Sequence, residues 1–126
     1  MASAPRTSLT SSTSRRASVA LRSYLVPGRL VPPSASGLRS RAVVLRSGGV
    51  MDWHSTGLRE ELLLVIRGAL QLEIEAPSAR RILRRSLRAG RSAFVPARTM
   101  HRVVNRSARS ALYLYITALA RPLQPS

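Results

Sequence analysis

Short strand-like runs, separated by turn residues, follow one another along this chain from Gly37 onward. Apolar and β-branched side chains recur within the runs, and Gly, Pro and Ser stand between them. The runs cover residues 41–46, 50–54, 61–67, 69–75, 80–88, 92–95, 101–105 and 111–117. Such spacing is typical of an all-β barrel or sandwich. Tyr24–Val26 and Leu30–Val31, with prolines beside them, are predicted as the first edge strands.

Two of these runs predict which side chains face each other. Residues 69–75 alternate Leu or Ile with Gln or Glu, which predicts one buried and one solvated face. Residues 80–88 fit a strand or a helix, and the turn residues before them favour a strand. Its arginines would then lie opposite Glu73 and Glu75.

The charge of the chain is strongly basic and unevenly distributed. All 21 basic residues are Arg, the 5 acidic residues lie between positions 52 and 75, and the net charge is +16. Such a balance raises nucleic acid as a partner. However, Arg without Lys also follows from GC-rich coding, few aromatic residues are present to stack on bases, and no nucleic-acid motif occurs. These three observations argue against nucleic acid as a partner.

Length and composition restrict the remaining classes. The 126 residues suit one domain, and the absence of cysteine excludes disulfides and thiolate metal sites. The longest apolar runs, Leu62–Ile66 and Ala111–Ile116, are far shorter than the roughly 20 residues of a membrane-spanning helix. We therefore expect a soluble, cytoplasmic protein with no membrane partner.

The first 23 residues differ in texture from the rest. They are rich in Ser, Thr, Ala and Arg and lack acidic residues, which predicts a disordered basic tail before a single domain at 24–120. An organellar transit peptide, a twin-arginine signal at Arg15–Arg16 and a wrongly assigned start remain alternatives.

The scarcest residue types gather in two segments. The two His, the one Asn, the one Trp and the one Phe all lie within 48–68 or 90–105. These segments resemble the two motifs of the cupin superfamily, G-x5-H-x-H-x(3,4)-E-x6-G and G-x5-P-x-G-x2-H-x3-N. The matching residues are Gly48, His54, Glu61, Gly68, Gly90, Pro96, His101 and Asn105. The resemblance covers about residues 41–118 and implies a cupin jelly-roll β-barrel, often a homodimer.

The resemblance also implies a mononuclear divalent-metal site made by His54, Glu61 and His101. Thr56 replaces the usual second histidine, but two imidazoles and one carboxylate can still hold a metal and leave positions open. Fe, Mn, Ni, Zn or Co would each suit these ligands. Glu60 and Glu61 point to opposite faces of a strand, and the family spacing selects Glu61.

Four other residues near the motifs have expected roles. Thr56 would face inward beside His54 and position a metal-bound water, and Asn105 would hold backbone rather than metal. Arg98 replaces the usual glycine, and it either receives a carboxylate or phosphate at the barrel mouth or is a solvated turn residue. Trp53 is interpreted as packing rather than stacking on a ligand.

The fold leaves several functions open. The first hypothesis is a metal-dependent enzyme, an oxygenase or isomerase, acting on a small organic molecule. The second is a non-catalytic cupin that binds or senses a ligand, in which both histidines serve only structure. The third is a nucleic-acid binder using the tail and the Arg-rich residues 80–91. The motifs of serine hydrolases and phosphate-loop enzymes are absent from the sequence.

Overall fold

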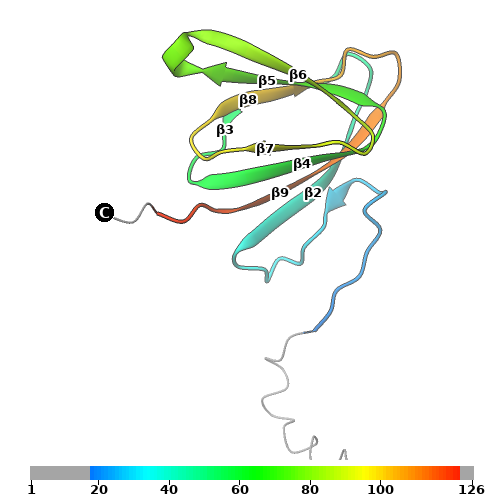
Figure 1. Cartoon of the computed structure of the whole chain (residues 1–126). Coiled ribbons are helices and arrows are strands. Elements are labelled where there is room, and N and C mark those ends of the chain that lie inside the picture. The colour runs from blue at the N-terminus through cyan, green and yellow to red at the C-terminus, as the bar shows by residue number, and fades with distance from the viewer. Residues whose placement is uncertain (1–17, 123–126) are drawn as a thin grey trace, which may run out of the picture.

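The computed structural model describes residues 18–122, which form an almost entirely β structure (Figure 1). The strands are β1 (Gly28–Arg29), β2 (Leu38–Leu45), β3 (Val50–Ser55), β4 (Arg59–Arg67), β5 (Ala69–Ala76), β6 (Arg81–Arg88), β7 (Ser92–Val95), β8 (Met100–Val104) and β9 (Ala111–Leu119). A short 3-10 turn, η2 (Pro77–Ala79), joins β5 to β6. No helix within residues 18–122 is long and apolar enough to cross a membrane.

The predicted all-β fold is confirmed, and its details differ mainly before residue 38. Each predicted run from 41 onward coincides with a strand, including the ambiguous stretch at 80–88, which is β6. The predicted edge strands at Tyr24–Val26 and Leu30–Val31 are wrong, because only Gly28–Arg29 pairs with β2. Most of the predicted tail, residues 1–17, lies outside the described residues.

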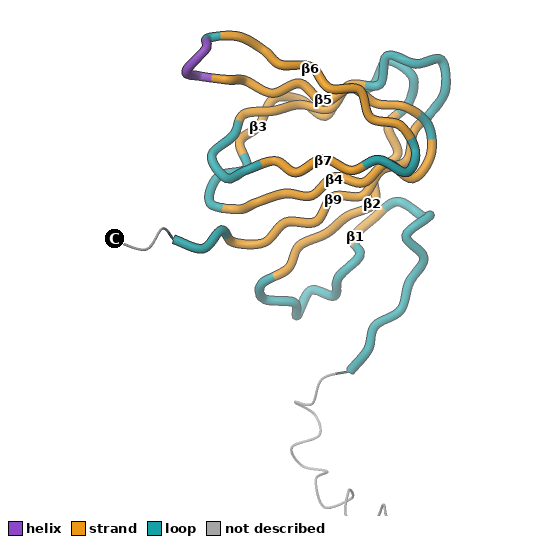
Figure 2. The backbone as a smooth tube through the Cα atoms, in the orientation of Figure 1, coloured by secondary structure: helices purple, strands orange, loops and turns teal. Residues whose placement is uncertain are grey.

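The strands form two antiparallel sheets that face each other (Figure 2). The five-stranded sheet has the order β1-β2-β9-β4-β7, and the four-stranded sheet has the order β3-β8-β5-β6. Neighbouring strands in each sheet are mostly far apart in the sequence, as in β2 with β9 and β3 with β8. This crossed connectivity encloses one interior between the sheets.

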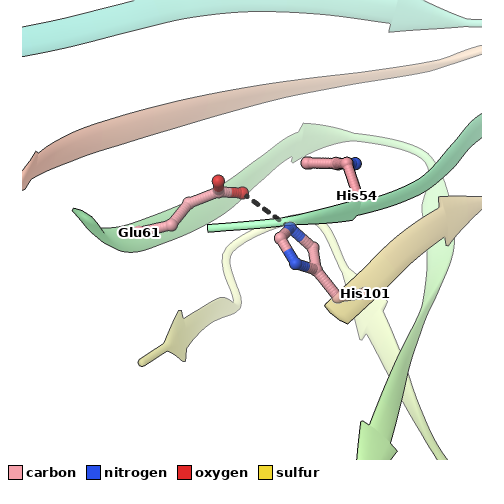
Figure 3. A group of neighbouring side chains, drawn as sticks. All are labelled: His54, Glu61 and His101. Atoms are coloured by element: carbon pink, nitrogen blue, oxygen red, sulfur yellow. Dashed lines mark ion pairs between the residues drawn. The ribbon is translucent and has the colours of Figure 1, made fainter. Parts of the chain in front are cut away.

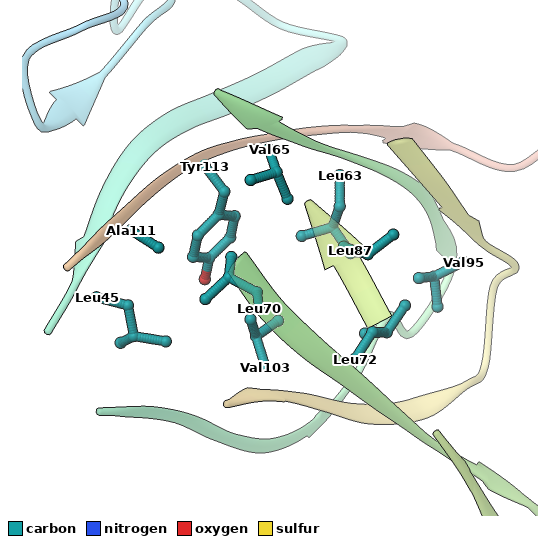
Figure 4. Close-up of a cluster of buried hydrophobic side chains, with 10 residues drawn as sticks. All are labelled: Leu45, Leu63, Val65, Leu70, Leu72, Leu87, Val95, Val103, Ala111 and Tyr113. Atoms are coloured by element: carbon teal, nitrogen blue, oxygen red, sulfur yellow. The ribbon is translucent and has the colours of Figure 1, made fainter. Parts of the chain in front are cut away.

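The interior is filled by alternate side chains from both sheets. Leu63, Val65 and Tyr113 of the five-stranded sheet meet Leu70 and Leu72 of the other in one buried cluster (Figure 4). Because side chains alternate along a strand, Tyr113 and its cross-strand partner Val65 point to the same inner face. On the opposite, outer face of the five-stranded sheet, a second cluster forms around Ala42, Leu112 and Leu114.

One glutamate on the polar face of β5 is buried, although the sequence predicts that this face is solvated. Glu73, predicted to face water, has 0% of its surface exposed. Three arginines surround it, and the distances to its carboxylate oxygens are 2.7 Å from Arg102 Nε, 3.1 Å from Arg106 Nη2 and 3.3 Å from Arg84 Nε. The predicted cross-strand pair with β6 is therefore present at Glu73, whereas Glu75 lies opposite Ile82.

This cluster predicts a pH-dependent stability. Burial alone would raise the pKa of Glu73, but hydrogen bonds from Arg102 and Arg106 and the charges of Arg102 and Arg84 outweigh it and lower the pKa below the ordinary 4.5. A depressed pKa means that the stabilisation is complete above about pH 4.5 and is lost as pH falls through the folded-state pKa.

We expect Glu73→Gln to lower the free energy of unfolding at pH 7 by about 1–2 kcal/mol. The loss is smaller than for a fully buried ion pair, because Arg84 and Arg106 are half exposed and water screens their charges. The difference from the native chain should shrink as urea titrations move to low pH. Glu75→Gln, on the same strand but exposed, is the matched control. A difference that stays constant between pH 7 and the acid range would contradict the role of the charge.

Candidate metal centre

Two histidines lie side by side on paired strands of the four-stranded sheet. His54 of β3 and His101 of β8 are direct cross-strand partners, and their ring centroids are 4.3 Å apart. A register irregularity between Met51 and His54 interrupts the β3 ladder just before this pair. His101 is completely buried, whereas His54 is exposed and lines a cavity.

The third residue comes from the opposite sheet. Glu61 of β4 is 8% exposed, and its Oε2 lies 3.5 Å from His101 Nε2 (Figure 3). One potential ligand atom from each of His54, Glu61 and His101 lies within 4.8 Å of the others. Glu60, the neighbouring carboxylate, is exposed. The family spacing and the alternation of β4 therefore select the same glutamate.

Backbone carbonyls orient both imidazoles. His54 Nδ1 lies 2.7 Å from the carbonyl oxygen of Asp52, and His101 Nδ1 lies 3.1 Å from that of Thr99. If each Nδ1 carries the proton, both Nε2 atoms keep a lone pair, which is the arrangement usual for metal-binding histidines.

The Nε2 atom of His101 is the exception to good hydrogen bonding in this region. It is buried and has no hydrogen-bond partner, because 3.5 Å to Glu61 exceeds a normal N–H···O length. Burial by itself lowers the pKa of His101, but Glu61 and the Thr99 carbonyl outweigh burial and raise the pKa. The donor set and this orphaned nitrogen both fit a bound divalent cation.

Thr56 and Arg98, the two departures from the family motifs, lie in facing turns. The Thr56 hydroxyl donates to the Pro96 carbonyl at 2.7 Å and accepts from the Thr99 backbone at 3.0 Å, so it ties the two turns together. Thr56 also lines the cavity. Arg98 is exposed, does not line the cavity and has a left-handed φ of 57°, the backbone conformation that glycine adopts at lowest cost.

Asn105 and Trp53 contact other parts of the protein and do not line the cavity. The Asn105 side chain is fully buried and donates to the carbonyls of Leu45 and Arg109, which confirms its role in holding backbone. Trp53 lies against Arg102, whose guanidinium carbon is 5.2 Å from the ring centroid. Trp53 does not line the cavity, in agreement with a packing role.

A cavity of about 930 Å³ opens beside His54 and Glu61, two of the three candidate ligands. Its polar lining includes Asp52, Tyr113, Tyr115 and Thr117, together with four arginines that sequence reasoning did not single out. These are Arg29, Arg39, Arg41 and Arg59. The available signal was the alternation of residues 38–45, in which Arg39 and Arg41 share a parity with the core residue Leu45.

Burial and nearby charges shift the pKa of two other side chains that line the cavity. Burial, with smaller contributions from Glu61 and Tyr115, raises the pKa of Tyr113, so its phenol stays protonated. Burial and the positive charge of Arg39 both lower the pKa of Arg59, although a guanidinium remains charged in proteins.

Several solved structures are similar to this chain in architecture. Oxalate oxidase in complex with glycolate is 24% identical with a TM-score of 0.62, and the match covers 68% of this chain and 44% of that one. A cupin 2 conserved barrel domain protein from Salinispora arenicola is 21% identical, with a TM-score of 0.62 and 75% coverage of both chains. The Schizosaccharomyces pombe Cnp3 cupin domain is 11% identical, with a TM-score of 0.64, 75% coverage of this chain and 64% of that one.

These matches carry information on the fold rather than on a particular activity. This chain spans less than half the length of the oxalate oxidase chains it matches. No protein-family model and no curated protein matches the sequence. The two facing antiparallel sheets and the likeness to several cupin-domain structures together show that this chain has the fold of the cupin superfamily.

Proposed function

We propose that the barrel binds one divalent metal ion through His54, Glu61 and His101, and a small organic ligand beside it in the cavity. The observation that carries this proposal is the buried Nε2 of His101, which has no hydrogen-bond partner. An unsatisfied buried polar group costs about 1–3 kcal/mol, and a metal bond would remove this cost. The metal would be Fe, Mn, Ni, Zn or Co, and it would supply Lewis-acid or redox chemistry.

The cavity supports the second half of the proposal. Its volume of about 930 Å³ lies within the range of small-molecule sites. Glu61 and His54 line this cavity, so a ligand inside it would lie directly against the candidate metal ligands. The fold also accommodates small acids elsewhere, since oxalate oxidase has been crystallised with the substrate analogue glycolate.

Elemental analysis of the purified, tag-free protein tests the metal site. We expect close to one divalent ion per chain in the native protein and almost none in His101→Ala, because that variant removes the buried ligand. Glu61→Gln should also lose most of the metal, whereas Glu60→Gln, altered at the adjacent exposed position, should keep it. Circular dichroism of each variant establishes that the barrel is folded.

Two outcomes would overturn the metal proposal. One is a folded native protein that holds no metal after incubation with Fe, Mn, Ni, Zn and Co salts and removal of the excess. The other is His101→Ala with a native metal content. Either result would assign the two histidines to structure alone.

Catalysis and simple binding are the two forms that this function can take. A metal-dependent oxygenase or isomerase would convert the ligand, whereas a sensing module would release it unchanged. Chromatography of the ligand after incubation with the metal-loaded protein, in air and under nitrogen, distinguishes the two. The homodimer and the cytoplasmic location stay predictions, and light scattering of the purified protein checks the former.

A further inference from the structure

The arginines of β2 lie on the inner face of their sheet because of their register with β9, and both are exposed at the open part of the cavity. Arg39 lies opposite Thr117, and Arg41 lies opposite Tyr115, one inward position along from the core residue Tyr113. The intervening Ser40 has the opposite parity and is buried on the other face. Arg39 and Arg41 therefore belong to the same face as the cavity, and both line it.

Arg59 joins this group from β4. Its Nε donates to Thr117 Oγ1 at 2.8 Å, and its Nη2 lies 2.9 Å from the carbonyl oxygens of both Thr117 and Gly37. These bonds hold the Arg59 guanidinium across β9 and against Gly37, which lies two residues before Arg39. Together, Arg39, Arg41 and Arg59 form an arginine wall along the cavity.

No internal carboxylate neutralises this wall. Within residues 18–122, every arginine that forms an ion pair does so with Glu73, on the outer face of the other sheet. The acids that line the cavity, Asp52 and Glu61, lie more than 4.0 Å from each arginine of the wall, since no such ion pair occurs. The three arginines of the wall thus line the cavity, and none of them forms an ion pair with a described residue.

The wall lies close to the candidate metal ligands. Thr117 is paired with Arg39 on one side and with Glu61 on the other, so the backbones of Arg39 and Glu61 are about 10 Å apart, the width of two strand spacings. Both side chains line the cavity. A compact ligand can therefore contact the wall at one end and the metal position at the other.

We propose that the arginine wall binds a carboxylate of a small organic acid whose other end lies at the metal position. A guanidinium matches a carboxylate with two parallel hydrogen bonds, which a neutral ligand cannot replace. The inference rests on the proposed function for the metal-facing end only, because the wall needs no metal to attract an acid. A small dicarboxylic acid has the required two polar ends.

Calorimetric titration with succinate, beside neutral succinamide and inorganic phosphate, tests the wall in the metal-loaded protein. We expect succinate to bind, and Arg39→Gln and Arg41→Gln each to weaken it about tenfold or more, as the loss of a charge-assisted hydrogen bond does. Neither side chain has a hydrogen bond to another described residue, so both variants should fold. Arg88→Gln, exposed and outside the cavity, should bind succinate as the native protein does.

The same titration on metal-free His101→Ala separates the two proposals. If this variant binds succinate more weakly but remains sensitive to Arg39→Gln, both proposals hold. If succinate binds equally well with and without metal, the wall stands and the metal end of the ligand is wrong.

Three results overturn the wall itself. The first is no succinate binding by the native protein. The second is equal weakening by Arg88→Gln, which would indicate general attraction to a basic chain. The third is equal or tighter binding of succinamide or phosphate, which would exclude a carboxylate-selective site.

Discussion

Alanine at position 68 is expected to lower the free energy of unfolding by about 3 kcal/mol, the sum of a backbone and a packing penalty. Gly68 has a φ of +87°, which L side chains rarely adopt. A Cβ at this position would lie 2.9 Å from both Cα and Cβ of Ala111 and 3.0 Å from the Ser110 carbonyl oxygen. Because backbone atoms form this contact, β9 itself would have to move.

Gly90 supplies a matched control for this effect. Its φ is +88°, almost identical to that of Gly68, but a Cβ there would meet no atom within 4 Å. Gly90→Ala should therefore cost only the backbone penalty of about 1–2 kcal/mol. Urea denaturation of both variants compares the two losses. Equal losses would show that the approach of Ala111 adds nothing.

Alanine in place of Asn105 is expected to cost about 3 kcal/mol, because it breaks several buried hydrogen bonds at once. The Asn105 amide donates to the carbonyls of Leu45 at 2.8 Å and Arg109 at 2.7 Å, and its oxygen accepts from the Ser107 amide at 2.9 Å and from the Ser107 hydroxyl. The side chain thus holds the loop between β8 and β9 to the end of β2.

Ser107→Ala is the control, since it removes only the hydroxyl that donates to Asn105 Oδ1 and leaves the Asn105 amide donating to the carbonyls of Leu45 and Arg109. It should cost about 1 kcal/mol or less by the same urea measurement. Folded Asn105→Ala protein should keep its metal at native levels. Loss of metal without loss of stability would contradict the structural role and place Asn105 at the metal site.

The strands of this protein could be predicted because their signal is local. Alternating apolar residues at 69–75 and turn residues around them depend only on the geometry of one strand, and β5 and β6 lie where these patterns indicate. The motif glycines Gly48, Gly68 and Gly90 all have positive φ. Their spacing therefore reflects backbone turns that few other residues can make.

The segment before β2 resisted prediction for the same reason. Short apolar pieces such as Tyr24–Val26 satisfy a strand pattern, but a strand also needs a partner edge, and only Gly28–Arg29 obtains one on β2. Glu73 shows the converse case. Its place on the polar face of β5 was clear from the sequence, whereas its burial depends on arginines from β6, β8 and the turn after β8.

The sequence by itself determined the β architecture, the positions of the turns and the two histidines and one glutamate that are available as metal ligands. The tertiary structure decided which groups meet: Glu61 with His101 across the interior, and Arg39 with Arg59 beside the cavity. Alternation along a strand specifies the face of each side chain. What faces it depends on the register of strands far apart in the chain, which only packing of the whole barrel sets.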